Sequence, residues 1–193
     1  MPALRAAVEG RVGGPSYRAR MTRIVYYVAS SLDGFIADPD DDLGWLLQFG
    51  FEAFQEHYDR FLAGVGAVVM GSTTYEFVRR EGAWPYELPA WVLTSAERPQ
   101  PEGGEVRFAS GDVSELLPVI RESAGERDVW IVGGGAVAAR FAEAGALDEV
   151  RVTVMPVLLG GGRALLPMRR TEPFELVGST PFSGGAIELV YRL

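Results

Sequence analysis

Two turns place glycine and hydroxyl side chains where an apolar run gives way to a helical pattern. One is Met70-Gly-Ser-Thr-Thr-Tyr75 and the other is Val132-Gly-Gly-Gly-Ala-Val137. A helix N-terminus offers unpaired backbone N–H groups and a partial positive charge, and glycine lets an anion approach the backbone closely. A tight turn before a capped helix explains either stretch alone. The two together favour a site for the phosphates of a dinucleotide.

Several reactive side chains are missing from the chain. It has no cysteine, all 18 basic residues are arginine, and His57 is the single histidine. These absences exclude disulfides, thiolate chemistry, lysine Schiff bases and a multi-histidine metal site. The acidic run from Asp38 to Asp42 does not have the spacing of a calcium loop, so no metal is expected. Hydride transfer fits this composition, because the cofactor supplies the reactive group.

Charge and hydropathy limit the partners and the location. The formal net charge of −8 argues against nucleic-acid binding, which needs a basic surface. No apolar run approaches the roughly 20 residues of a membrane helix. Residues 1–20 contain no signal-peptide core and are interrupted by glycine and proline, so we expect a disordered N-terminal extension and a cytoplasmic protein. Residues 21–193 are expected to form one domain.

The elements that must position these turns alternate between strands and helices. A long polar loop is expected over 30–44 and a closing hairpin over 174–180 and 186–191. Alternation of this kind predicts an α/β fold with a mostly parallel sheet covered by helices on both faces, and the hairpin adds antiparallel strands. The other predicted strands are 24–29, 65–70, 90–94, 105–109, 129–132 and 149–157, and helices are predicted at 51–62, after 71, at 112–123 and at 134–142.

The triple glycine also matches a different dinucleotide site. Gly133-x-Gly135-x-x-Ala138 fits the Rossmann fingerprint. That fingerprint normally follows the first strand, with an acidic residue near the end of the next strand about 20 residues on. Here it follows a late strand, and Asp148 and Glu149 precede a strand. A Rossmann-type NAD dehydrogenase is therefore the weaker alternative.

Four segments taken in order resemble a known family. They are Ala29-Ser-Ser-Leu-Asp-Gly-Phe-Ile-Ala37, Val68-Val-Met-Gly-Ser-Thr-Thr-Tyr-Glu76, Val129-Trp-Ile-Val-Gly-Gly-Gly135 and Val152-Thr-Val-Met-Pro-Val-Leu-Leu-Gly-Gly-Gly162. Residues 22–193 resemble the dihydrofolate reductase superfamily, most closely the C-terminal reductase domain of the riboflavin-biosynthesis deaminase-reductase. The resemblance implies a three-layer α/β/α fold with an eight-stranded, mostly parallel sheet and an antiparallel C-terminal hairpin. It also implies NADPH bound across the carboxyl ends of the strands.

The resemblance assigns cofactor-binding residues by position. Dihydrofolate reductases carry basic residues where this chain has Ser72 and Ala136, so NADH is not excluded, and Arg79 or Arg98 would have to hold the 2′-phosphate. The implied cofactor-binding residues are Ala29, Ile36, Gly71, Ser72, Thr73, Thr74, Thr94, Ser95, Val132, Gly133, Gly134, Gly135, Ala136 and Val137.

The substrate side is expected on the first helix. Dihydrofolate reductases place a buried carboxylate there after a loop tryptophan, and Trp45 followed by Glu52 or Glu56 fits this loosely. A carboxylate in an apolar pocket could orient a heterocycle; the alternative is a solvated pair on the outer face. Thr153 matches a family position near the substrate ring. His57 is expected at the surface and receives no role.

These observations lead to a functional hypothesis. It is an NADPH-dependent reductase of a small heterocyclic substrate, similar to a pterin or an aminouracil, or of a carbonyl. A nucleotide-binding member of the fold without turnover is the alternative. Phe35 stands where the riboflavin enzymes usually have lysine, which argues against the riboflavin step itself. The resemblance also implies a homodimer through the sheet edge, where 152–159 and the final hairpin are apolar.

Overall fold

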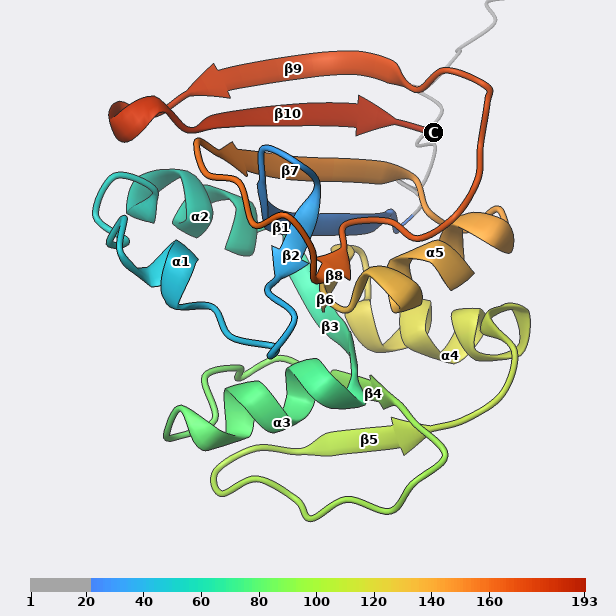
Figure 1. Ribbon diagram of the computed structural model, residues 1–193. Coiled ribbons are helices and arrows are strands. Elements are labelled where there is room, and N and C mark those ends of the chain that lie inside the picture. Colours follow the sequence, from blue (N-terminus) through green and yellow to red (C-terminus); the bar gives the residue numbers. More distant parts are fainter. Residues whose placement is uncertain (1–21) are drawn as a thin grey trace, which may run out of the picture.

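A computed structural model describes residues 22–193, so the predicted extension over 1–20 lies outside the described residues (Figure 1). Apolar and β-branched runs form the strands, whereas the helices follow polar or glycine-rich turns. The strands are β1 (Ile24–Ser31), β2 (Phe35–Ala37), β3 (Val65–Gly71), β4 (Ala90–Leu93), β5 (Val106–Ala109), β6 (Asp128–Gly133), β7 (Glu149–Met155), β8 (Arg163–Ala164), β9 (Glu175–Pro181) and β10 (Ile187–Arg192). The helices are α1 (Gly44–Leu47), α2 (Gln55–Leu62), α3 (Ser72–Arg80), α4 (Val113–Ala124) and α5 (Gly135–Glu143), with a short 3₁₀ turn at Ser183–Gly185.

Eight of the strands form one sheet in the order β5-β4-β3-β6-β1-β7-β10-β9. The six strands from β5 to β7 pair in parallel, and β10 and β9 add antiparallel pairs at one edge. The predicted fold class is confirmed. The Rossmann alternative is wrong, because the glycine-rich turn follows β6, which lies between β3 and β1 and is not the first strand of a doubly wound unit.

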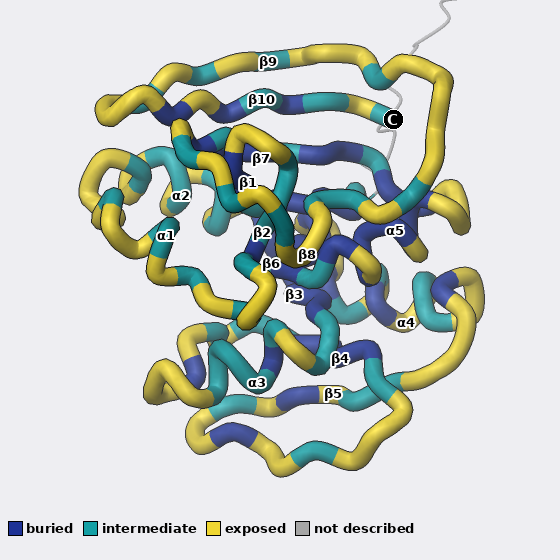
Figure 2. Tube along the Cα trace, viewed as in Figure 1, coloured by how far each residue is buried: buried dark blue, intermediate teal, exposed yellow. Residues whose placement is uncertain are grey.

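Helices cover both faces of this sheet, and each face has its own core. On one face α4 and α5 pack over Tyr26 and Ile131 of the sheet, and Phe141 of α5 enters that core. On the other face α2 and α3 pack over Tyr27 and Trp130, and Tyr75 of α3 enters that core. Figures 1 and 2 show α2 and α3 on one side of the buried central strands and α4 and α5 on the other.

The segment predicted as a loop over 30–44 contains regular structure. β1 continues through Ser31, and Phe35–Ala37 forms β2, which pairs antiparallel with β8 in a second small sheet. The single turn α1 follows. The sequence does not predict this three-residue strand, because so short a run among glycines and aspartates has no detectable periodicity. No helix among residues 22–193 is both long and apolar enough to cross a membrane.

Candidate active site

A cleft of about 510 Å³ opens where β3 and β6 end beside each other. The carboxyl edge of parallel strands is where α/β proteins commonly bind ligands. One wall comes from α3, the floor from the turn after β6 and the roof from β2 and β8. The lining residues are Val28, Ile36, Ala37, Asp41, Leu43, Thr73, Thr74, Phe77, Val132, Gly133, Gly134, Gly135, Ala136, Gly162, Arg163, Ala164 and Pro167.

The glycines of the turn after β6 are required by close packing and by backbone conformation. A Cβ on Gly135 would lie 2.2 Å from the carbonyl oxygen of Ala164, and one on Gly133 would lie 2.9 Å from Oγ1 of Thr74. Gly134 has a φ of 87°, which L-residues with side chains rarely adopt. The turn therefore presents bare backbone to the cleft.

Two helices begin at this cleft with open N-termini. Gly71 precedes α3 and Gly134 precedes α5, and within residues 22–193 no side chain caps either helix. The first backbone N–H groups of a helix have no partner inside the helix, so here they are available to a ligand. Together with the two helix dipoles, these donors fit an anion such as a diphosphate.

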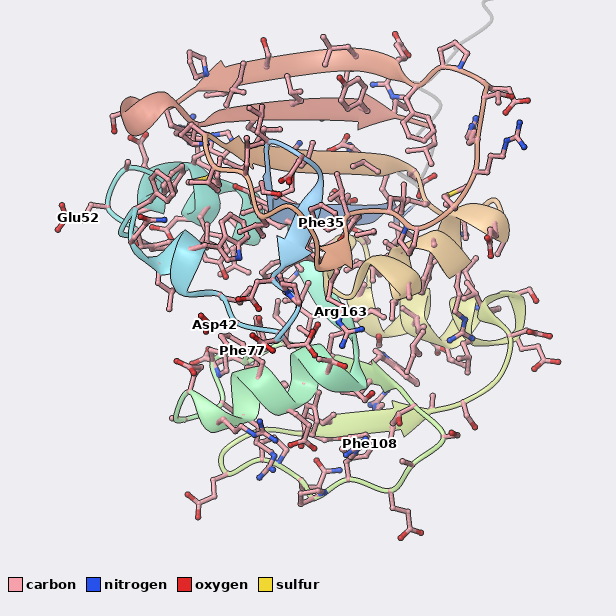
Figure 3. The ribbon with its side chains drawn as sticks, in the orientation of Figure 1. Phe35, Asp42, Glu52, Phe77, Phe108 and Arg163 are labelled. Atoms are coloured by element: carbon pink, nitrogen blue, oxygen red, sulfur yellow. The ribbon has the colours of Figure 1, made fainter. Side chains whose placement is uncertain are left out.

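The roof of the cleft joins distant parts of the chain. Arg163 of β8 donates two hydrogen bonds to Asp41, from Nε at 2.5 Å and from Nη2 at 2.7 Å, and these bonds lower the pKa of the Asp41 carboxyl. Asp33 accepts the backbone N–H groups of Leu159 and Gly160. Arg163 and Phe77, which both line the cleft, are labelled in Figure 3, and the charge of Arg163 is paired with that of Asp41.

A second hollow of about 410 Å³ lies beyond α3, at the ends of β4 and β5. Thr94, Ser95, Arg98 and Phe108 are among its lining residues. The hollow combines hydroxyl groups with one cation, Arg98, and one carboxylate, Glu97, and the guanidinium of Arg98 also lies 3.4 Å from the Glu76 carboxylate. That chemistry suits a ribose or a phosphate.

The structure brings most of the predicted cofactor residues together. Gly71, Ser72 and Val137 lie just behind the cleft, at the starts of α3 and α5. Ala29 does not line it, although its neighbour Val28 does. Eight predicted residues line the cleft, namely Ile36, Thr73, Thr74, Val132, Gly133, Gly134, Gly135 and Ala136, and Thr94 and Ser95 line the second hollow.

The predicted substrate carboxylates are at the surface. Glu52 is exposed before α2 begins and points away from the sheet (Figure 3), and the side chain of Glu56 is 90% exposed. Neither has an apolar pocket, so the expectation of a buried carboxylate at either position is wrong. The cause is the late start of the helix, at Gln55, which leaves Glu52 in the preceding turn and Glu56 on the solvent side of the helix.

A different carboxylate is buried on this side of the sheet. Glu188 of β10 is 1% exposed, and Nε2 of His57 lies 2.9 Å from both of its carboxylate oxygens. Thr153 is also buried and stands opposite Glu188 in the strand register. Sequence reasoning missed Glu188 and His57. One signal was available, because Glu188 is the only acidic residue of an otherwise mostly apolar terminal strand.

Comparison with known proteins gives a consistent set of relatives. The chain is 29% identical over 170 residues to a Bacillus subtilis (strain 168) protein named uncharacterized protein YwjB, covering 88% of this chain and 97% of that protein. It is 25% identical to the riboflavin biosynthesis protein RibD of Mycobacterium tuberculosis over 152 residues, which are 75% of this chain but only 45% of RibD.

Solved structures share the fold. A Shewanella sp. PV-4 protein named for riboflavin biosynthesis superposes with a TM-score of 0.76 at 26% identity, covering 89% of this chain and 98% of that one. Dihydrofolate reductase from Enterococcus faecalis, solved with NADP(H), superposes with a TM-score of 0.61 at 19% identity over 89% of this chain and 96% of that one. The model of the RibD C-terminal domain matches residues 86–187, which are more than half of the chain. The protein belongs to the RibD C-terminal domain family, within the fold of dihydrofolate reductase.

Proposed function

We propose that this protein is an NADPH-dependent reductase that transfers hydride to a small heterocyclic or carbonyl substrate. The observation that carries the proposal is the cleft in which the uncapped N-termini of α3 and α5 meet across glycine backbone. The family and the fold are those of reductase domains, which supports the same reading.

The chain's residues would divide the work of binding along the sheet edge. The turn of Gly133–Gly135 and the start of α3 would hold the diphosphate by backbone N–H donors. Ile36 and Leu43 would cover the nicotinamide, and the adenosine end would reach Thr94 and Ser95. A bound reduced nicotinamide supplies the hydride. The protein then contributes alignment and the exclusion of water.

Calorimetric titration with NADPH and with NADH tests the proposal. We expect saturable binding of NADPH with a Kd in the micromolar range, on the order of −8 kcal/mol. Absence of heat and of any protection against thermal unfolding at millimolar concentrations of both nucleotides would overturn it. Binding without oxidation across dihydropterins, aminouracils and quinones would favour the alternative of a nucleotide-binding protein without turnover.

Preference for NADPH over NADH would rest on Arg98 in the second hollow. Arg98→Ala should weaken NADPH binding about tenfold and leave NADH binding unchanged, because only NADPH carries a 2′-phosphate for a charge-assisted hydrogen bond. Arg107→Ala is the matched control, since Arg107 of β5 lies over the ring of Trp91 on neighbouring β4 and does not line the hollow. Equal weakening of both nucleotides by Arg98→Ala would contradict this assignment.

The homodimer stays a prediction. β9 forms one edge of the eight-stranded sheet and exposes Leu176 and Val177. An edge strand with apolar side chains is a surface suited to pairing with a second copy.

A further inference from the structure

Reduction of a carbonyl or an imine needs a proton as well as a hydride. Among the residues that line the cleft in the described chain, Asp41 and Arg163 are the only ionisable ones. Hydrogen bonds from Arg163 lower the pKa of the Asp41 carboxyl, so that carboxyl is anionic at neutral pH and has no proton to give. No side chain that lines the cleft therefore supplies this proton.

A polar cluster lies next to the cleft on the face covered by α2. In the strand register Glu188 stands opposite Thr153, and Thr153 stands opposite Ala29, so the three side chains share one face of the sheet. Ala29 is half-buried and follows Val28, which lines the cleft. Successive residues of a strand face opposite sides of the sheet, so the cluster lies on the α2 side, toward the carboxyl ends of β1 and β7, whereas the side chain of Val28 faces the α5 side.

His57 reaches this cluster from α2 and leaves one ring nitrogen open. Its Nε2 lies 2.9 Å from both oxygens of Glu188, and its ring packs edge-on against Phe182 at 5.3 Å between centroids. In the described part of the chain no protein group hydrogen bonds to Nδ1, and the side chain is 20% exposed. One nitrogen is thus fixed by a buried carboxylate, while the other is available to a ligand.

The other ionisable groups around His57 do not compete for this role. On β1, burial and the adjacent Glu188 carboxylate raise the pKa of Tyr27 to about 12, so its hydroxyl is a much weaker acid than an imidazolium. On β7, Arg151 donates to Glu149 and lies over the ring of Phe61. The neighbouring acidic groups of α2 are exposed.

We propose that His57 is the proton donor of the reduction and that Glu188 holds it as an imidazolium; the inference rests on the proposed reductase function. Hydride adds to the carbon of a C=O or C=N bond, and the π electrons move to the oxygen or nitrogen. That atom takes the proton from Nδ1, which leaves neutral imidazole with its Nε2–H still donated to Glu188. Water then returns a proton to Nδ1. The substrate class is an acceptor with a basic oxygen or nitrogen at the reduced bond.

The test compares His57→Gln, Glu188→Gln and the control Asp59→Asn, which is exposed on the same helix. Wild-type protein is first screened with NADPH against dihydropterins, aminouracils, aldehydes and quinones, and the fastest substrate is used for the variants. We expect His57→Gln to lower kcat about 100-fold, as for loss of a general acid. Its Kd for NADPH should stay within twofold of wild type, and the control should keep full activity.

A pH profile separates proton donation from a structural role. The protonation of His57, the single histidine, is followed by ¹⁵N NMR. We expect wild-type kcat to fall over the same pH range in which the imidazole loses its proton, and we expect this fall to be absent in His57→Gln. The inference is overturned if His57→Gln keeps native thermal stability and either retains kcat within twofold or shows an unchanged pH profile. The proposed reductase function would survive that result. If the wild-type protein turns over no substrate of the panel, both the role of His57 and the proposed reductase function are overturned. If Glu188→Gln does not fold, the kcat and the pH profile of His57→Gln still test whether His57 donates the proton.

Discussion

Gly134→Asp should abolish cofactor binding while the protein stays folded. The new Cβ would lie 3.5 Å from Cγ2 of Val137 and 3.8 Å from the backbone nitrogen of Gly71, so it fits between the starts of α3 and α5. The carboxylate would then occupy the position of a bound phosphate. Like charges brought together cost several kcal/mol, so we expect the Kd for NADPH to rise at least about 100-fold in calorimetric titration.

Two comparison variants separate charge from backbone strain. Gly134→Asn has nearly the same size without the charge and should bind NADPH more tightly than Gly134→Asp. Gly125→Asp introduces the same residue at another glycine of positive φ, 62°, at the exposed end of α4, and should bind like wild type. Unchanged affinity in Gly134→Asp would show that the phosphates lie elsewhere.

Phe141→Ala should cause the largest loss of stability. Phe141 is fully buried on α5, in the core between that helix and the sheet. Removing a buried phenyl ring costs about 3–5 kcal/mol, because the lost transfer free energy adds to that of the cavity. Each kcal/mol lowers Tm by roughly 2–4 °C in a domain of this size, so a drop of about 10 °C is expected by calorimetry.

Val119→Ala is the matched control for this prediction. Val119 lies on the adjacent helix α4 and is 44% exposed, so its truncation should change the free energy of unfolding by less than about 0.5 kcal/mol. A loss below about 1 kcal/mol for Phe141→Ala would contradict the packing of α5 on the sheet.

The fold and the cleft proposed for the cofactor could be predicted from the sequence because their signals are local. The apolar runs that became β3 and β6 are each followed at once by a glycine-rich turn, and parallel strands bring such turns to one edge. The position of Gly134 in a turn at this edge was therefore predictable from the local sequence pattern. The substrate half depends on pairings between residues far apart in the chain.

His57 and Glu188 illustrate that limit. They are separated by 131 positions, and their contact depends on how α2 lies over β10. The sequence favours Glu52 and Glu56 and leaves His57 without a role, because helical periodicity alone does not show where the helix begins. The actual start at Gln55 turns His57 inward and leaves Glu56 in water.

The roof over the cleft has a consequence for the order of folding. Its contacts join Asp33 to Leu159 and Gly160, and Asp41 to Arg163, across more than 120 residues of chain. Closing such long loops is entropically costly, so these contacts form after the central strands have paired. Asp33, Gly160 and Arg163 are exposed, so we expect these segments to open early in native fluctuations. A ligand held beneath them would therefore slow protease cleavage at the roof more than anywhere else in the domain.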